Sequence, residues 1–156
     1  MDLEVVTKKP DMNSHPTPLL FVHGAWHGAW CWEHFQSYFA EQGYTLYAVN
    51  LRGHGNSEGR DRIRWFRAAE YVADVTQIVN QLPPSSVLIG HSAGGYLLQK
   101  YLESHSAAAV VLLASISARR TWKLFFSNEQ ASSVAVRQNA FDLEFFCLHR
   151  DAEVGP

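Results

Sequence analysis

A serine surrounded by glycines is the feature of this sequence with the clearest chemical potential. Gly90-His91-Ser92-Ala93-Gly94, followed by Gly95, matches the pattern G-x-S-x-G. In this pattern the serine occupies a sharp turn from a strand into a helix, and the small residues let the two elements pass close together. The turn exposes the serine oxygen beside a helix amino end, whose amide groups and dipole stabilise negative charge. Ser92 is therefore the candidate nucleophile.

A second motif, His23-Gly24-Ala25, directly follows the apolar run 19–22. A loop at the end of such a strand can supply a second backbone amide to an oxyanion hole. We predict that the N–H groups of Ala25 and Ala93 form this pair of donors. His23 is interpreted as a histidine that shapes the loop through backbone hydrogen bonds. We assign His91 a packing or hydrogen-bonding role, so neither ring is the expected base.

The elements that must position these motifs follow from the hydrophobic pattern. Apolar runs of strand length alternate with stripes of helical spacing, which is typical of a parallel sheet covered by helices on both faces. The predicted strands are 3–7 (an edge strand), 19–22, 44–49, 86–89 and 108–113, and the predicted helices lie within 30–42, 71–82 and 95–102. With 156 residues, this predicts one α/β domain over 1–156.

The pattern changes after Ser117. The segment 118–150 mixes aromatic and polar residues, and we interpret it as a helical lid. A sheet that ended after residue 114 would leave an apolar edge strand without a partner, which favours aggregation.

Composition excludes several classes of function. The formal charge is −2, and the arginines at 60, 62, 64 and 67 are diluted by Glu58, Asp61 and Glu70. We therefore expect neither nucleic acid nor a membrane surface as partner. The amino terminus lacks the pattern of a signal peptide and no apolar run is long enough to span a bilayer, so a cytoplasmic protein is expected.

Cofactor motifs are absent from the sequence. The two cysteines, Cys31 and Cys147, form no redox or zinc pattern, and His27, His34 and His54 have no metal-ligand spacing. Gly53-His54-Gly55 lacks the third glycine and the immediate helix of a dinucleotide site. We expect neither metal nor cofactor.

The two motifs, together with Arg52-Gly53-His54-Gly55-Asn56-Ser57, resemble the α/β-hydrolase superfamily over about residues 19–117. Within it, HGAWHGAWCW is similar to the branch of small esterases, hydroxynitrile lyases and plant methylesterases. The resemblance implies a histidine that takes the proton of Ser92, an acid that orients it, and an acyl-serine intermediate. A serine at position 92, where epoxide hydrolases and haloalkane dehalogenases of the superfamily carry aspartate, argues against those two chemistries.

The sequence departs from this pattern beyond the serine. The superfamily order is Ser, then Asp or Glu, then His, and only His105 and His149 follow Ser92. The helix after Ser92 carries His105 about 20 Å away. Asp142 and His149 have the right order but the wrong spacing, and we interpret them as solvated lid residues. We therefore expect a chain truncated at its carboxyl end, with a complete but degenerate chain as the alternative.

Three functions remain open on these grounds. The first is a serine hydrolase of small carboxylic esters, with Ser92 as nucleophile and a small ester as its binding partner. The second is a hydroxynitrile lyase on the same scaffold. The third is a non-catalytic ligand-binding or degenerate member of the superfamily.

Overall fold

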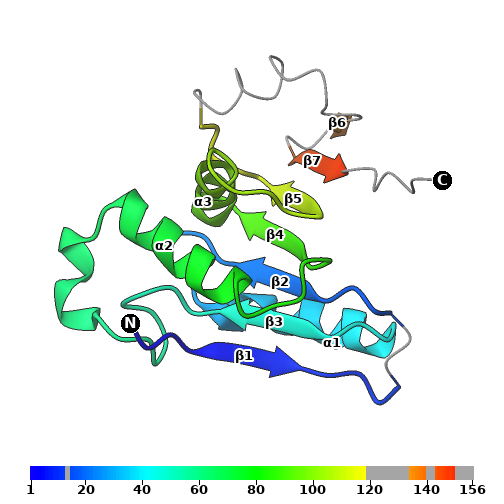
Figure 1. The fold of residues 1–156 in the computed structure, drawn as a ribbon, viewed down its shortest axis with the longest axis horizontal. Helices are drawn as coiled ribbons and strands as arrows, with labels where there is room; N and C mark the ends of the chain where they lie inside the picture. Colours follow the sequence, from blue (N-terminus) through cyan, green and yellow to red (C-terminus); the bar gives the residue numbers. More distant parts are fainter. Residues whose placement is uncertain (13–14, 119–133, 140–142, 150–156) are drawn as a thin grey trace.

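The structure, a computed structural model, describes residues 1–12 and 15–118, together with the backbone of two strands at 134–139 and 143–149. A sheet with the strand order β1-β3-β2-β4-β5-β7-β6 forms its centre (Figure 1). The strands are β1 (Val5–Lys8), β2 (Leu19–Val22), β3 (Leu46–Val49), β4 (Val87–His91), β5 (Ala109–Leu113), β6 (Val134–Asn139) and β7 (Leu143–His149).

The four strands β3, β2, β4 and β5 run parallel, whereas β1 pairs antiparallel with β3. Helices connect the parallel strands: η1 (Ala29–Trp32) and α1 (Glu33–Glu41), η2 (Arg60–Trp65) and α2 (Ala68–Val79), and α3 (Ala93–Tyr101). The predicted α/β class and the predicted strands of the parallel sheet are thus confirmed.

Two hydrophobic clusters show how the sheet is covered. In β2, Leu20 and Val22 join the cluster that includes Val75 of α2 and Leu98 of α3. The alternate residues Leu19 and Phe21 join the cluster that includes Trp32 and Ala40 of η1 and α1. Side chains of a strand alternate between its faces, so α2 and α3 cover one face and α1 covers the other. The loops after β2, β3, β4 and β5 meet at the carboxyl edge of the sheet.

The prediction of helix over 118–150 is wrong for two stretches. Residues 134–139 and 143–149 are the strands β6 and β7, and β7 pairs antiparallel with β5. The pairing covers the edge of β5 that would otherwise expose unpaired backbone groups, which is the physical reason for strands here. Residues 119–133 and 140–142 lie outside the described residues, and the role of the segment as a lid stays a prediction.

Candidate active site

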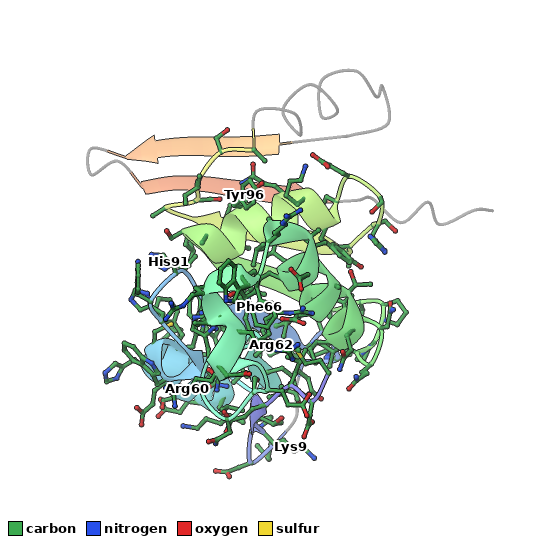
Figure 2. All side chains as sticks on the ribbon, turned by 90° about the vertical axis from the view of Figure 1, so that its left-hand side faces the viewer. Lys9, Arg60, Arg62, Phe66, His91 and Tyr96 are labelled. Carbon is green, nitrogen blue, oxygen red and sulfur yellow. The ribbon has the colours of Figure 1, made fainter. Side chains whose placement is uncertain are left out.

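Ser92 occupies the turn between β4 and α3. Its backbone angles are φ 51° and ψ −115°, a conformation that residues with a side chain rarely adopt. Such a conformation costs about 1–3 kcal/mol and persists only when the surrounding structure enforces it. Ser92 is partly exposed at the carboxyl edge, where its neighbour His91 is labelled in Figure 2.

The glycines around Ser92 are required by close backbone contacts. A Cβ atom on Gly90 would lie 2.7 Å from Cα and N of Gly95, so the strand and the helix touch at this point. A Cβ atom on Gly94 would collide with the carbonyl oxygens of Val22 and His23. The amino end of α3 is therefore packed directly on the carboxyl end of β2.

The loop after β2 lies against the serine. A Cβ atom on Gly24 would be 3.1 Å from Cβ of Ser92 and 3.2 Å from Nδ1 of His91. The amides of Ala25 in this loop and Ala93 in the first turn of α3 donate no hydrogen bond within the part of the chain that the structure describes. Two backbone N–H groups, one on each of two segments next to the serine, are therefore free to donate hydrogen bonds to a bound group.

His23 is a buried ring with both nitrogens engaged. Its Nδ1 donates to the carbonyl oxygen of Gly24 at 2.8 Å, and its Nε2 accepts the N–H of Leu51 at 3.1 Å. Burial lowers the pKa of His23 to about 4, so the ring is neutral near pH 7. His23 therefore fastens the loop after β2 to the loop after β3, and its position favours the predicted structural role over that of a base.

Two further histidines lie close to the serine. His27 donates from Nδ1 to the carbonyl oxygen of Ala25 at 2.8 Å, and its ring lies 5.7 Å from that of His91. Burial lowers the pKa of His91, which also contacts Trp32 at a ring distance of 6.4 Å. Among the residues that the structure describes, none forms a hydrogen bond with Oγ of Ser92.

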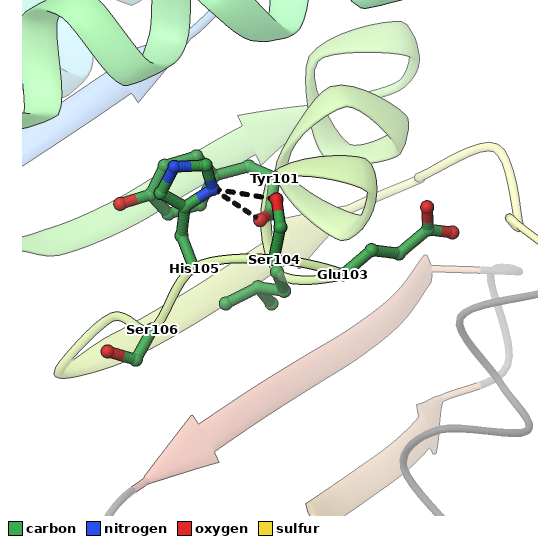
Figure 3. A pocket seen from close by; sticks show the side chains of 6 residues that line it. Tyr101, Glu103, Ser104, His105 and Ser106 are labelled. Carbon is green, nitrogen blue, oxygen red and sulfur yellow. Dashed lines mark hydrogen bonds between the residues drawn. The ribbon is translucent and has the colours of Figure 1, made fainter.

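The two histidines that follow Ser92 in the sequence are placed away from it. His105 stacks on Tyr101 beyond the far end of α3, beside a shallow depression lined by residues 101–106 (Figure 3). The backbone of His149 is in register with Ala109, whereas His91 is in register with Leu113 at the other end of β5. Four residues of strand correspond to about 13 Å, so the backbone of His149 lies towards the opposite edge of the sheet. Asp142 is outside the described residues.

The three tryptophans that follow β2 differ in their exposure. Trp32 is buried in the core, but Trp26 and Trp30 are 95% and 68% exposed. Trp26 also has a positive φ of 66°, which is strained for a bulky residue. The indoles of Trp26 and Trp30 therefore lie at the surface rather than in the core.

Sequence reasoning missed several polar residues that hold these loops. Oδ1 of Asn50 accepts the N–H of Ala29 at 2.7 Å, and its Nδ2 donates to Glu4 at 2.6 Å. Asp74 binds Arg52 of the loop after β3, and Gln99 binds the segment after β5. The available signal was a polar residue at a position that the apolar pattern assigns to the interior. A polar residue at such a position indicates that its side chain is buried, but it does not identify the hydrogen-bond partner.

Within residues 1–12 and 15–118, no three His, Cys, Asp or Glu residues are grouped so that they could hold a metal ion. None of the helices described is both long and apolar enough to cross a bilayer.

Residues 19–152 match the family model of the Alpha/beta hydrolase family, and the chain belongs to this family. It is 32% identical over 104 residues to Norfluorocurarine synthase 1 of Strychnos nux-vomica, which covers 62% of this chain and 38% of the relative. It is 34% identical over 82 residues to Methylesterase 3 of Arabidopsis thaliana, covering 51% of this chain and 31% of the relative.

A solved structure shows the same fold. The esterase EaEST from Exiguobacterium antarcticum superposes with a TM-score of 0.63 at 22% identity, over 72% of this chain and 41% of that protein. The chain therefore spans less than half the length of each of these three proteins, and what they catalyse bears on this chain only as a proposal.

Proposed function

We propose that this chain carries the nucleophile of a serine esterase, with Ser92 attacking the carbonyl carbon of a small carboxylic ester. The observation that carries the proposal is the strained backbone of Ser92 at the end of β4, with the loop of Gly24 packed against it. Strain of this kind is kept where function requires a particular geometry. The esterase and methylesterase among the similar proteins support ester chemistry.

The amides of Ala25 and Ala93 would bind the oxygen of the tetrahedral intermediate. Both are backbone donors beside Ser92, and Ala93 lies at the positive end of the dipole of α3. Loss of one oxyanion donor typically lowers the rate by about 10²–10³-fold. Gly24 allows the two segments to approach, because any side chain there would press on Ser92 and His91.

A base must accept the proton of Ser92 and pass it to the leaving alkoxide. A carboxylate must orient that base, and water must then hydrolyse the acyl-serine ester. His23 is unsuited because both of its ring nitrogens are already bonded. Residues 13–14, 119–133, 140–142 and 150–156, which the structure does not describe, include no histidine, so neither the base nor the acid is assigned within these 156 residues.

A second candidate function is ligand binding without turnover. It is favoured by one observation: within the described residues, Ser92 Oγ has no histidine bonded to it. A serine without a base binds an ester-like ligand in the same oxyanion hole but does not hydrolyse it. The two candidates therefore differ in whether a covalent acyl group forms.

The experiment that tests the proposal is exposure of the chain to p-nitrophenyl acetate, with Ser92→Ala as the control. We expect slow release of p-nitrophenolate and one acetyl group on the peptide that contains Ser92, because an oxyanion hole keeps a residual catalytic effect where the base is missing. Acetylation that persists in Ser92→Ala would contradict the role of Ser92. Saturable binding of the ester without acetylation would instead support the non-catalytic candidate.

A further inference from the structure

Gln99 is a buried polar side chain on the helix that begins at Ser92, and the proposed chemistry does not use it. It is 8% exposed and lies in the second turn of α3, between the buried apolar residues Leu98 and Tyr101. A buried amide is costly unless its donors and acceptor are bonded. The partners of Gln99 therefore show what this residue holds in place.

All but one of the side-chain contacts of Gln99 are to the segment that leaves the sheet after β5. Its Nε2 donates to Oγ of Ser115 at 2.8 Å and to the carbonyl oxygen of Ile116 at 2.9 Å. Its Oε1 accepts the N–H of Ala118 at 3.1 Å. A longer contact of 3.3 Å reaches the carbonyl oxygen of Gly95 in the same helix. Both ends of one amide group thus bind the segment 115–118.

The same segment is bonded to Ser92. The N–H of Ile116 donates to the carbonyl oxygen of Ser92 at 3.3 Å, and the N–H of Ser92 donates to the carbonyl oxygen of Leu113 at 2.9 Å. Ser115 also packs closely on the helix, since a Cβ atom on Gly95 would lie 2.7 Å from its Cβ. The N–H of Ser92 is therefore held by the last residue of β5, and its carbonyl group is bonded by the chain that follows β5.

We propose that Gln99 is a positioning residue for Ser92, acting through the backbone of Ile116. A residue at a positive φ relaxes unless its neighbours enforce that conformation. Gln99 fixes the segment 115–118, and the N–H of Ile116, together with that of Tyr96 at 3.2 Å, fixes the carbonyl group of Ser92. The proposal rests on the proposed function of Ser92 as nucleophile. It adds that the angle of attack depends on an amide two helical turns away.

The test compares Gln99→Met and Gln99→Glu with the same substitutions at Gln36. Gln36 is a matched control because it is 4% exposed, lies in α1, and makes one hydrogen bond, to the carbonyl oxygen of Val6 at 3.1 Å. Two properties are measured for each variant. One is the hydrogen exchange of the amides of Ser92, Ile116 and Ala118, and the other is the rate of reaction of Ser92 with a fluorophosphonate relative to the unaltered chain.

We expect Gln99→Met to keep the packing and remove every hydrogen bond of the side chain. Exchange of the amides of Ile116 and Ala118 should rise at least tenfold, and that of Ser92 should rise with them, while β2 is unchanged. The reaction of Ser92 should slow by a similar factor. Gln36→Met should leave all of these unchanged.

Gln99→Glu supplies a readout that packing alone would not alter. A protonated carboxyl can donate to Ile116 and accept from Ala118, whereas an ionised one has no donor. Protection of the amides from exchange and the reactivity of Ser92, each relative to the unaltered chain at the same pH, should therefore be restored at low pH and lost as pH rises. The transition should lie above the usual glutamate pKa of about 4.3, because burial beside carbonyl oxygens disfavours ionisation.

Unchanged exchange at Ile116 and Ala118 in Gln99→Met would overturn the proposal. So would an equal effect of Gln36→Met, or a response of Gln99→Glu that does not vary with pH. If Ser92 of the unaltered chain does not react with the fluorophosphonate, the proposed function fails. The exchange of the Ser92 amide then still decides whether Gln99 positions this residue.

Discussion

The carboxylate of Asp74 in α2 fixes the loop after β3, and neutralising it should be severely destabilising. Asp74 is 1% exposed and binds the guanidinium of Arg52 through both of its oxygens, at 2.7 to 3.0 Å. It also accepts the backbone N–H of Arg52 at 3.0 Å. We predict that Asp74→Asn lowers the free energy of unfolding more than any exposed charge change.

The magnitude follows from what remains around Arg52. An asparagine keeps one acceptor oxygen but directs its NH2 group at donors of Arg52, and at least two hydrogen bonds to a charged group are lost. Each is worth about 1.5–3 kcal/mol. The remaining carboxylate partner, Glu70, is at 3.3 Å and is 43% exposed, so it compensates only in part. Breaking a buried ion pair on one side costs about 3–5 kcal/mol, and we expect a loss in this range.

Urea unfolding followed by tryptophan fluorescence measures this loss. Asp61→Asn is the control, because Asp61 pairs with Arg62 at 3.8 Å and both side chains are mostly exposed. The control should change the free energy of unfolding by less than about 1 kcal/mol. A value for Asp74→Asn within about 1 kcal/mol of the unaltered chain would refute the reasoning, because the Arg52 contacts would then contribute little.

Three further predictions concern the serine turn and the histidine beneath it. Gly94→Ala should lower the free energy of unfolding by at least about 2 kcal/mol in urea titrations, because its Cβ would collide with backbone oxygens of β2; an unaltered midpoint would contradict this packing. Ser92→Gly should be more stable than Ser92→Ala by about 1 kcal/mol, since only glycine removes the penalty of the positive φ; the reverse order in thermal unfolding would show that the turn is unstrained. The free energy of unfolding should also fall as pH drops from about 6.5 towards 4, by about 1.4 kcal/mol per pH unit for one histidine. The reason is that His23 in the unfolded chain binds a proton in this range, whereas the folded ring has a pKa of about 4 and stays neutral. The lowered pKa of Glu4, caused first by the N–H of Asn56, adds a loss of the same sign at lower pH. Urea unfolding at several pH values should give a flatter profile for His23→Gln, and equal slopes would contradict the assignment.

Local patterns were sufficient to predict the serine turn and the parallel sheet. The spacing of Gly90, Gly94 and Gly95 reflects contacts between adjacent elements, so the sequence carries that information within a few residues. The apolar runs of β2 and β4 are buried on both faces and that of β5 is buried or half-buried throughout, which makes them recognisable without knowledge of their partners.

Contacts between distant segments were not predictable in the same way. The pairing of β7 with β5 depends on which segment covers a free edge, and the mixed pattern of 118–150 did not reveal it. Gln99 and Asp74 were likewise visible only as polar residues in apolar stripes, because their partners lie in other loops. The exposure of Trp26 and Trp30 depends on how the loop after β2 turns, which residue type alone does not specify.

The most direct test of the central claim is mass analysis of the chain after reaction with a fluorophosphonate, with Ser92→Ala treated in parallel. We predict one phosphonyl adduct, located on the peptide that contains Ser92 and absent from Ser92→Ala. An adduct on another residue, or no adduct on a folded chain, would contradict the claim that the strained turn after β4 presents Ser92 as the nucleophile.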